Sequence, residues 1–197
     1  MCINFETSII SFFIGQIYGY KLFTSNIKKN KVIGLFSMFI SIIQLIEAII
    51  YISNNKMYKN FNRLLAIFLG LQGFFVYYIH NRIFNKKNKN KNILYYINLL
   101  ISLTIIIVAL NNNFNSGEKK GCIDWIFLDN HKIISRLLMI MYISIFILFV
   151  QNKIYHKYTI YLIITLLVSY LIKPIKNSPS MWCLSSALVT PIYYYFN

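Results

Sequence analysis

Charged side chains are scarce in this sequence of 197 residues, and acids are the scarcest, with 5 Asp and Glu against 20 Lys and Arg. Only 13% of the residues are charged and 57% are apolar. In soluble domains, about 25% of the residues are charged and about 45–50% are apolar. This composition excludes an ordinary soluble enzyme, and the 16 Phe and 16 Tyr exclude a disordered chain. Because long apolar runs separate the basic residues, the net charge of +15 does not indicate nucleic-acid binding. The composition is typical of a multi-spanning membrane protein.

Groups needed for several chemistries are also missing. The last apolar run contains no Lys, which excludes a retinal Schiff base there. His80, His131 and His156 fall at run ends or in connections and never at i, i+4 spacing, so we predict solvated histidines and no metal site. No deeply placed Ser has a base beside it in its own run, so we expect neither an enzyme nor a cofactor. The chain has no N-x-[ST] sequon and no prenylation box.

Seven apolar runs approach the length of about 20 residues that a helix needs to cross the roughly 30 Å hydrocarbon core of a bilayer. Asn- and Lys-rich strings separate them, such as NKKNKNKN at 85–92. We therefore predict an all-α, polytopic transmembrane helical bundle of about seven spans that occupies residues 1–197 without a soluble domain. The predicted spans are residues 7–23, 32–53, 61–80, 93–110, 133–150, 158–172 and 181–196.

The distribution of Lys and Arg predicts the orientation of the bundle. No basic residue precedes the first run, and Lys28, Lys29 and Lys31 follow it. Placing the first, third and fifth connections inside collects slightly more basic residues there than outside, which predicts an outer N-terminus and an inner C-terminus. The first run lacks a basic segment before it and is therefore read as an uncleaved span. We expect a short interfacial helix around residues 123–128 in the longest connection.

Small residues at helical spacing predict close approach of helices in lipid. We expect these faces to pack inside one bundle, with homodimerisation as the alternative. Pro191 has no amide hydrogen and is expected to kink the last span. The small residues are Ser11, Gly15 and Gly19 in the first run and Ala66, Gly70 and Gly73 in the third.

Glu47 is the only acid deep within a predicted span, and an ionisable group at membrane depth is a functional-site hypothesis by default. We predict an ion pair between Glu47 and Arg136, with Gln44 and Gln72 as polar neighbours. The alternative is a protonated Glu47 bonded to Gln44, with Arg136 extending to the membrane surface. Asn98 in the fourth run completes this predicted intramembrane polar cluster.

Cys2, Cys122 and Cys183 are all expected on or near the outer side. Three cysteines allow three single pairings, and their spacing does not choose among them. We favour a disulfide between Cys122 and Cys183, and free thiols are the alternative.

Several short features are spread over most of the chain: Gln44, Glu47, Gly70-Leu71-Gln72, Gly121 to Trp125 and Ser180 to Cys183. Together they resemble an uncharacterised family of seven-span membrane proteins encoded by large nucleocytoplasmic DNA viruses. In that family the glutamine of the third helix is often followed by Pro, where this chain has Gly73. The resemblance implies a membrane protein of unknown activity in host or virion membranes, and it supplies no mechanism.

Three functions compete at this point. The first is a structural or interaction protein of a viral or host membrane, whose partners are the lipid bilayer and a membrane protein or a second copy. The second is a small transporter or channel that uses the polar interior around Glu47. The third is a seven-helix receptor with an outward-facing pocket near Trp182 and Arg136. A structural or interaction protein predicts a closed, packed bundle.

Overall fold

The fold is known from a computed structural model that describes residues 5–52, 58–84, 92–111, 117–119, 122–124, 132–172 and 189–196. The first six predicted apolar runs each lie on one long helix. These helices are α1 (Phe5–Thr24), α2 (Lys28–Ile52), α3 (Tyr58–Phe84), α4 (Asn92–Asn111), α6 (Lys132–Gln151) and α7 (His156–Ile172). Of the seventh run, residues 189–196 are helical and the others lie outside the described residues.

Three of these helices are long and apolar enough to cross a membrane. They contain the segments Lys28–Ile52, Asn60–Phe84 and Ile93–Asn111. The bent pair Arg136–Gln151 and Lys153–Ile164 makes a fourth candidate if it is counted as one span. The structure is therefore a helical bundle with three or four candidate membrane spans.

The α6–α7 corner differs most from the predicted arrangement of separate spans. The two helices are bent by 97° at a short break. The break falls at Asn152, directly before the 3₁₀ turn η2 (Lys153–Tyr155), and the Tyr155 amide donates to the carbonyl of Asn152 at 2.9 Å. Helix α7 therefore does not continue the axis of α6.

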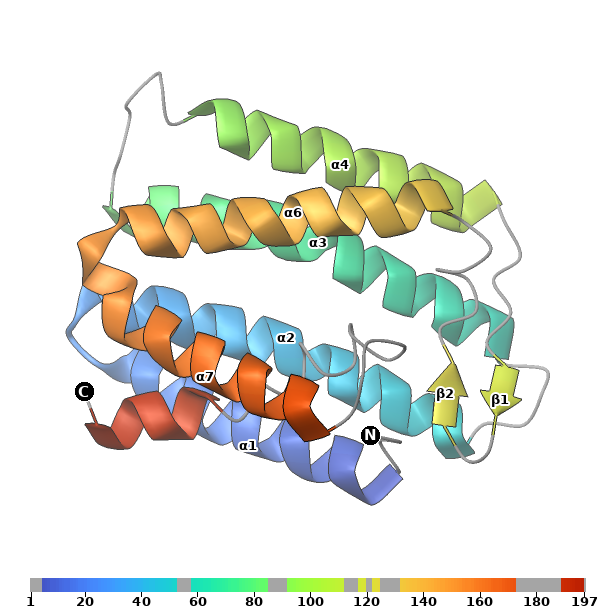
Figure 1. The fold of residues 1–197 in the computed structure, drawn as a ribbon, viewed down its shortest axis with the longest axis horizontal. Coiled ribbons are helices and arrows are strands. Elements are labelled where there is room, and N and C mark those ends of the chain that lie inside the picture. The colour runs from blue at the N-terminus through green and yellow to red at the C-terminus, as the bar shows by residue number, and fades with distance from the viewer. Residues whose placement is uncertain are drawn as a thin grey trace.

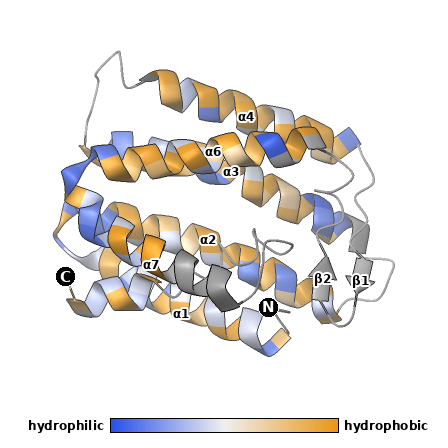
Figure 2. Ribbon diagram, in the orientation of Figure 1, coloured by the Kyte–Doolittle hydropathy of each residue, from blue (hydrophilic) through white to orange (hydrophobic). Residues whose placement is uncertain are grey.

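The long helices α1, α2, α3, α4 and α6 run along the longest dimension of the molecule (Figure 1). Helix α1 packs along α2, which packs along α3, and α3 also contacts α4 and α6. A core of buried apolar side chains fills the interior, and Phe36 of α2 meets Phe149 of α6 with ring centroids 5.7 Å apart. Much of the outer surface of α4 and α6 is apolar (Figure 2).

A small hairpin replaces part of the expected interfacial helix. Strand β1 (Gly117–Lys119) pairs antiparallel with β2 (Cys122–Asp124), with Glu118 opposite Ile123. The prediction of a helix is therefore wrong for residues 123 and 124, because their backbones bond to the neighbouring strand instead of along the chain. Residues 125–128 lie outside the described part of the chain.

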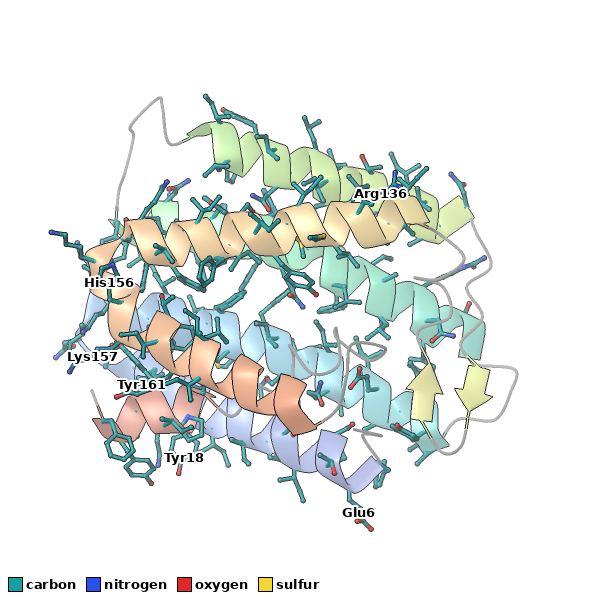
Figure 3. All side chains as sticks on the ribbon, viewed as in Figure 1. Glu6, Tyr18, Arg136, His156, Lys157 and Tyr161 are labelled. Atoms are coloured by element: carbon teal, nitrogen blue, oxygen red, sulfur yellow. The ribbon has the colours of Figure 1, made fainter. Side chains whose placement is uncertain are left out.

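The C-terminal helical residues 189–196 close the bundle between α1, α2 and α7. Thr190 bonds Ser37 of α2 at 2.6 Å, and the ring of Tyr193 lies 5.5 Å from that of Tyr158 in α7. On the exposed side, Tyr18 of α1 bonds the hydroxyl of Tyr195 at 3.0 Å (Figure 3). Pro191 lies within this helix, and the position four residues before it, where a kink would arise, is outside the described residues.

Candidate functional site

The sequence pattern predicted one polar cluster, and the structure contains polar groups at two levels of the bundle. Both are built from side chains that are almost completely buried. The first level lies on α2 toward its C-terminal end and includes Gln44 and Glu47. The second lies where α3, α4 and α6 meet and includes Asn98 and Ser144.

Gln44 and Glu47 lie one helical turn apart on the buried face of α2. Glu47 is 1% exposed and Gln44 is fully buried. Neither the Nε2 nor the Oε1 atom of Gln44 has a hydrogen-bond partner among the described residues. A buried amide left without a hydrogen bond costs about 1–3 kcal/mol relative to a satisfied one.

The neighbouring helices place other polar residues at this level. Gly15 of α1 faces Ser41 of α2 and Gly19 faces Gly34, so the two helices run antiparallel. Continued along α1, this register brings the buried Ser8 to the level of Glu47. The hydroxyl of Ser8 has no hydrogen-bond partner among the described residues.

Gln72 lies apart from this level. Phe39 of α2 stacks between Phe68 and Phe75 of α3, at centroid distances of 5.5 and 4.3 Å. Gln72 is therefore level with Phe39, at least one helical turn from Gln44 and about two turns from Glu47. The predicted grouping of Gln72 with Glu47 needs this correction, because the register of α2 against α3 sets Gln72 beside Phe39.

Arg136 is not the partner of Glu47 in this structure. Its side chain is exposed on α6 and lies near one end of α4 (Figure 3). Glu47 is buried on α2, and no ion pair joins the two residues. The prediction was wrong because the depth of a residue along a span does not determine the helix face on which its side chain lies. The face of α6 that contacts α3 carries Met141 and Ser144 instead.

The second polar level is a connected hydrogen-bond network. Ser144 of α6 donates to the Oδ1 atom of Asn98 at 2.9 Å, and Asn98 donates through Nδ2 to the carbonyl of Leu94 at 2.7 Å. Tyr77 of α3 donates to the backbone carbonyl of Ser144 at 2.8 Å. These bonds join three helices, as expected for polar groups buried between helices in lipid.

Small residues make these close approaches between helices possible. A Cβ atom on Gly73 would collide with Asn98 and would lie 2.5 Å from Cγ of Met141. Gly70 faces Ile105 of α4, and Ser102 of α4 donates to the Gly70 carbonyl at 2.7 Å. The buried face of α1 contains Ser11, Gly15 and Gly19, and Ala66 is buried on α3.

Gly34 was missed by the sequence pattern. A Cβ atom there would collide with the Gly19 carbonyl oxygen and would lie 2.6 Å from the amide nitrogen of Phe23. It lies three residues before Ser37 and seven before Ser41, on the same buried face of α2. This spacing of small residues is the signal that could have found it.

His80 and Tyr155 form a polar contact at the end of the second level. The Nδ1 atom of His80 lies 2.8 Å from the Tyr155 hydroxyl, and both residues are buried. The prediction of a solvated His80 was wrong, because α3 continues to Phe84 and η2 covers this face. His156 is exposed, as predicted (Figure 3), and His131 lies outside the described residues.

A pocket of about 200 Å³ opens beside this contact. It lies between the C-terminal ends of α3 and α6 and the start of α4. Its polar lining includes Tyr77, His80, Asn81, Gln151 and Asn152. Because Gln151 is exposed and Asn81 is half-buried, the pocket reaches the surface at this end of the bundle.

Two further predictions remain without a test. Cys122 lies in β2, whereas Cys183 lies outside the described residues, so the disulfide stays a prediction. Within the described ranges, no group of three or more His, Cys, Asp or Glu residues is arranged to hold a metal ion.

Comparisons with protein-family models, curated proteins and solved structures gave no significant match. The resemblance to a viral membrane family therefore stays a prediction from short features.

Proposed function

We propose that this chain is a multi-pass integral membrane protein with seven spans, an outer N-terminus and an inner C-terminus. The observation that carries this proposal is the set of exposed apolar side chains on helices that are mostly hydrophobic (Figure 2). Lipid covers such side chains without cost, whereas water would leave a patch far larger than soluble monomers expose. The exposed apolar side chains include Leu100, Leu103 and Ile107 on α4 and Met139, Ile140 and Ile143 on α6.

Within the membrane, the function best supported is that of a structural or interaction protein of a viral or host membrane. Close glycine contacts and a buried apolar core occupy the bundle interior. The polar network of Asn98 and Ser144 bonds inward, to other helices, and so serves cohesion of the bundle. Its partners are the lipid bilayer and either a membrane protein or a second copy of the chain.

Membrane extraction and reconstitution test this proposal together. We expect the full-length chain to stay in the membrane fraction under alkaline carbonate, because its apolar faces are anchored in lipid. Proteoliposomes containing it should show no more proton, K⁺ or Cl⁻ flux than empty liposomes. Release into the carbonate supernatant would contradict membrane integration, and a flux above background would contradict the purely structural role.

The second candidate is a small transporter or channel, and the buried amide of Gln44 favours it. An amide that lacks a partner among the described residues is suited to bind a transported ion or polar molecule. Glu47, one turn away, supplies an acid at the same level. These two residues define the site that transport would require.

Substitutions at Gln44 and Glu47 separate the two candidates. For a transporter, Gln44→Leu and Glu47→Gln should abolish flux, while Thr104→Ala on the exposed face of α4 should leave it unchanged. For a structural protein, Gln44→Leu should leave stability unchanged or raise it, because an unsatisfied buried amide is replaced by an apolar group of similar size. The flux and the unfolding midpoint of the same preparations decide between these outcomes.

A further inference from the structure

The two ends of the bundle differ in charge. The end formed by the α1–α2 turn, the C-terminus of α3 and the α6–α7 corner carries most of the described basic residues. His156 and Lys157 mark this end and Glu6 marks the other (Figure 3). The described acids lie toward the opposite end, on α1, on α2 and in the hairpin. The basic residues of the first end are Lys21, Lys28, Lys29, Lys31, Arg82, Lys153 and Lys157.

The pocket between α3, α4 and α6 opens at this basic end. Asn81 and Gln151 line it with side-chain amides, which donate through their NH₂ groups. Asn152, also in the lining, donates to the Leu148 carbonyl at 2.6 Å, which fixes the orientation of its amide. The pocket wall is thus built from hydrogen-bonding groups held by helix ends.

Basic residues flank this polar lining on two helical segments. Arg82 follows Asn81 directly at the end of α3, and Lys153 follows Asn152 at the start of η2. Both are exposed, and neither residue forms an ion pair in the described structure. No acid is among the described residues that line the pocket, and the two full charges of Arg82 and Lys153 exceed the partial negative charges at the C-terminal ends of α3 and α6, so the net local charge is positive.

We propose that this pocket binds the phosphate group of an anionic molecule. Neutral amide donors in the lining, and basic residues that follow two of the lining residues in the sequence, suit a phosphate, which accepts several hydrogen bonds and carries negative charge. A volume of about 200 Å³ suits a small headgroup. Basic pockets between helices at the membrane surface hold phospholipid headgroups in this way. The phosphate comes either from an anionic phospholipid or from a soluble phosphate compound.

A phospholipid as the source of the phosphate rests on the proposed membrane location of the chain. The phosphate site itself does not depend on that location. If carbonate extraction shows no membrane integration, the proposed function fails independently of the pocket. If the chain is integrated but the pocket variants below bind anionic lipid normally, only the phosphate site fails.

Lipid binding by the full-length protein tests the proposal. Purified protein is exchanged into phosphatidylcholine nanodiscs with and without phosphatidylglycerol, and co-purifying lipid is measured by native mass spectrometry. We expect retention of phosphatidylglycerol over phosphatidylcholine. The double variant Arg82→Gln with Lys153→Gln should reduce that preference roughly tenfold, since each basic residue near the surface contributes substantially to anionic-lipid binding.

A matched control removes the same charge from the same end. Lys21 and Lys28 are exposed on α1 and at the start of α2, away from the pocket lining. The double variant Lys21→Gln with Lys28→Gln should keep most of the phosphatidylglycerol preference. Equal losses in the two double variants would overturn the proposal, because they would show attraction by the surface charge alone.

A second pair of substitutions tests the pocket without changing charge. Asn81→Leu with Gln151→Leu should abolish the preference while the unfolding midpoint stays near that of the natural protein. A folded variant with unchanged preference would also overturn the proposal. Competition by inorganic phosphate identifies a soluble source, and phosphatidylglycerol binding that phosphate does not displace identifies the headgroup.

Discussion

At the scale of single residues, the closest contacts between a described glycine and backbone atoms of another helix lie between α1 and α2. Gly34 faces the backbone of α1, where the Gly19 carbonyl and the Phe23 amide leave no room for a methyl group. Backbone atoms cannot rotate away as a side chain can, so an added Cβ must push the two helices apart. The tolerance of this position therefore measures how firmly α1 is held.

Gly34→Ala should lower the free energy of unfolding by about 1–3 kcal/mol, as overpacking of a tight interior does. Denaturant titration in detergent micelles measures this loss of stability. Gly70→Ala is the matched control, because the nearest atoms there belong to the side chain of Ile105, with Cγ2 at 2.8 Å. A loss at Gly70 as large as that at Gly34 would contradict the assignment of backbone contact to Gly34.

Asn98 offers a second test at this scale, because α4 carries a matched exposed residue. Asn98 is fully buried and accepts a bond from Ser144, whereas Thr104 is exposed and bonds only the Leu100 carbonyl of its own helix. Asn98→Ala should destabilise the bundle by about 1–2 kcal/mol, and Thr104→Ala by less than about 0.5 kcal/mol. Equal effects in thermal unfolding would show that the interhelical bond contributes nothing.

At the scale of elements, the α6–α7 corner depends on Tyr155. Its hydroxyl lies 2.8 Å from Nδ1 of His80, and its ring meets the Phe149 ring at a centroid distance of 5.3 Å. The residue therefore ties η2 to α3 through one polar contact and to α6 through an aromatic one. These two contributions can be separated by substitution.

Tyr155→Phe keeps the ring and removes the hydroxyl, so it should cost about 1 kcal/mol of stability. Tyr155→Ala removes both and leaves a cavity, so it should cost about 3–5 kcal/mol. Unfolding of both variants in the same detergent measures the difference. If the two variants are equally stable, ring packing does not hold the corner.

The elements also show what can be read from sequence. The apolar runs predicted the helices α1, α2, α3, α4, α6 and α7 because each run contains enough apolar side chains to form a helix that packs or faces lipid. Helix faces were harder to predict: Arg136 and Met141 lie on the same run, and only Met141 turns toward α3. The pocket beside His80 was not predictable, since α3, α4 and α6 meet there only through tertiary packing.

At the scale of the whole molecule, orientation depends on a small difference in basic charge between the two sides. Lys28, Lys29 and Lys31 follow the first predicted span, and they contribute much of the inner excess. The natural chain has no N-x-[ST] sequon, so a single engineered sequon reports the side of one connection without background.

Sequons inserted at residues 54–56 should be glycosylated in the natural chain, and sequons at 86–90 should not, because the predicted topology places the first stretch outside and the second inside. Replacing Lys28, Lys29 and Lys31 with Gln removes the inner excess, so a fraction of molecules should insert inverted and acquire glycans at 86–90. Replacing Lys56 and Lys59 with Gln increases the inner excess and should leave one orientation. If the triple variant keeps the natural glycosylation pattern, the connection between the first two predicted spans does not determine the topology. The four lysines of residues 85–91 are then the stronger determinant.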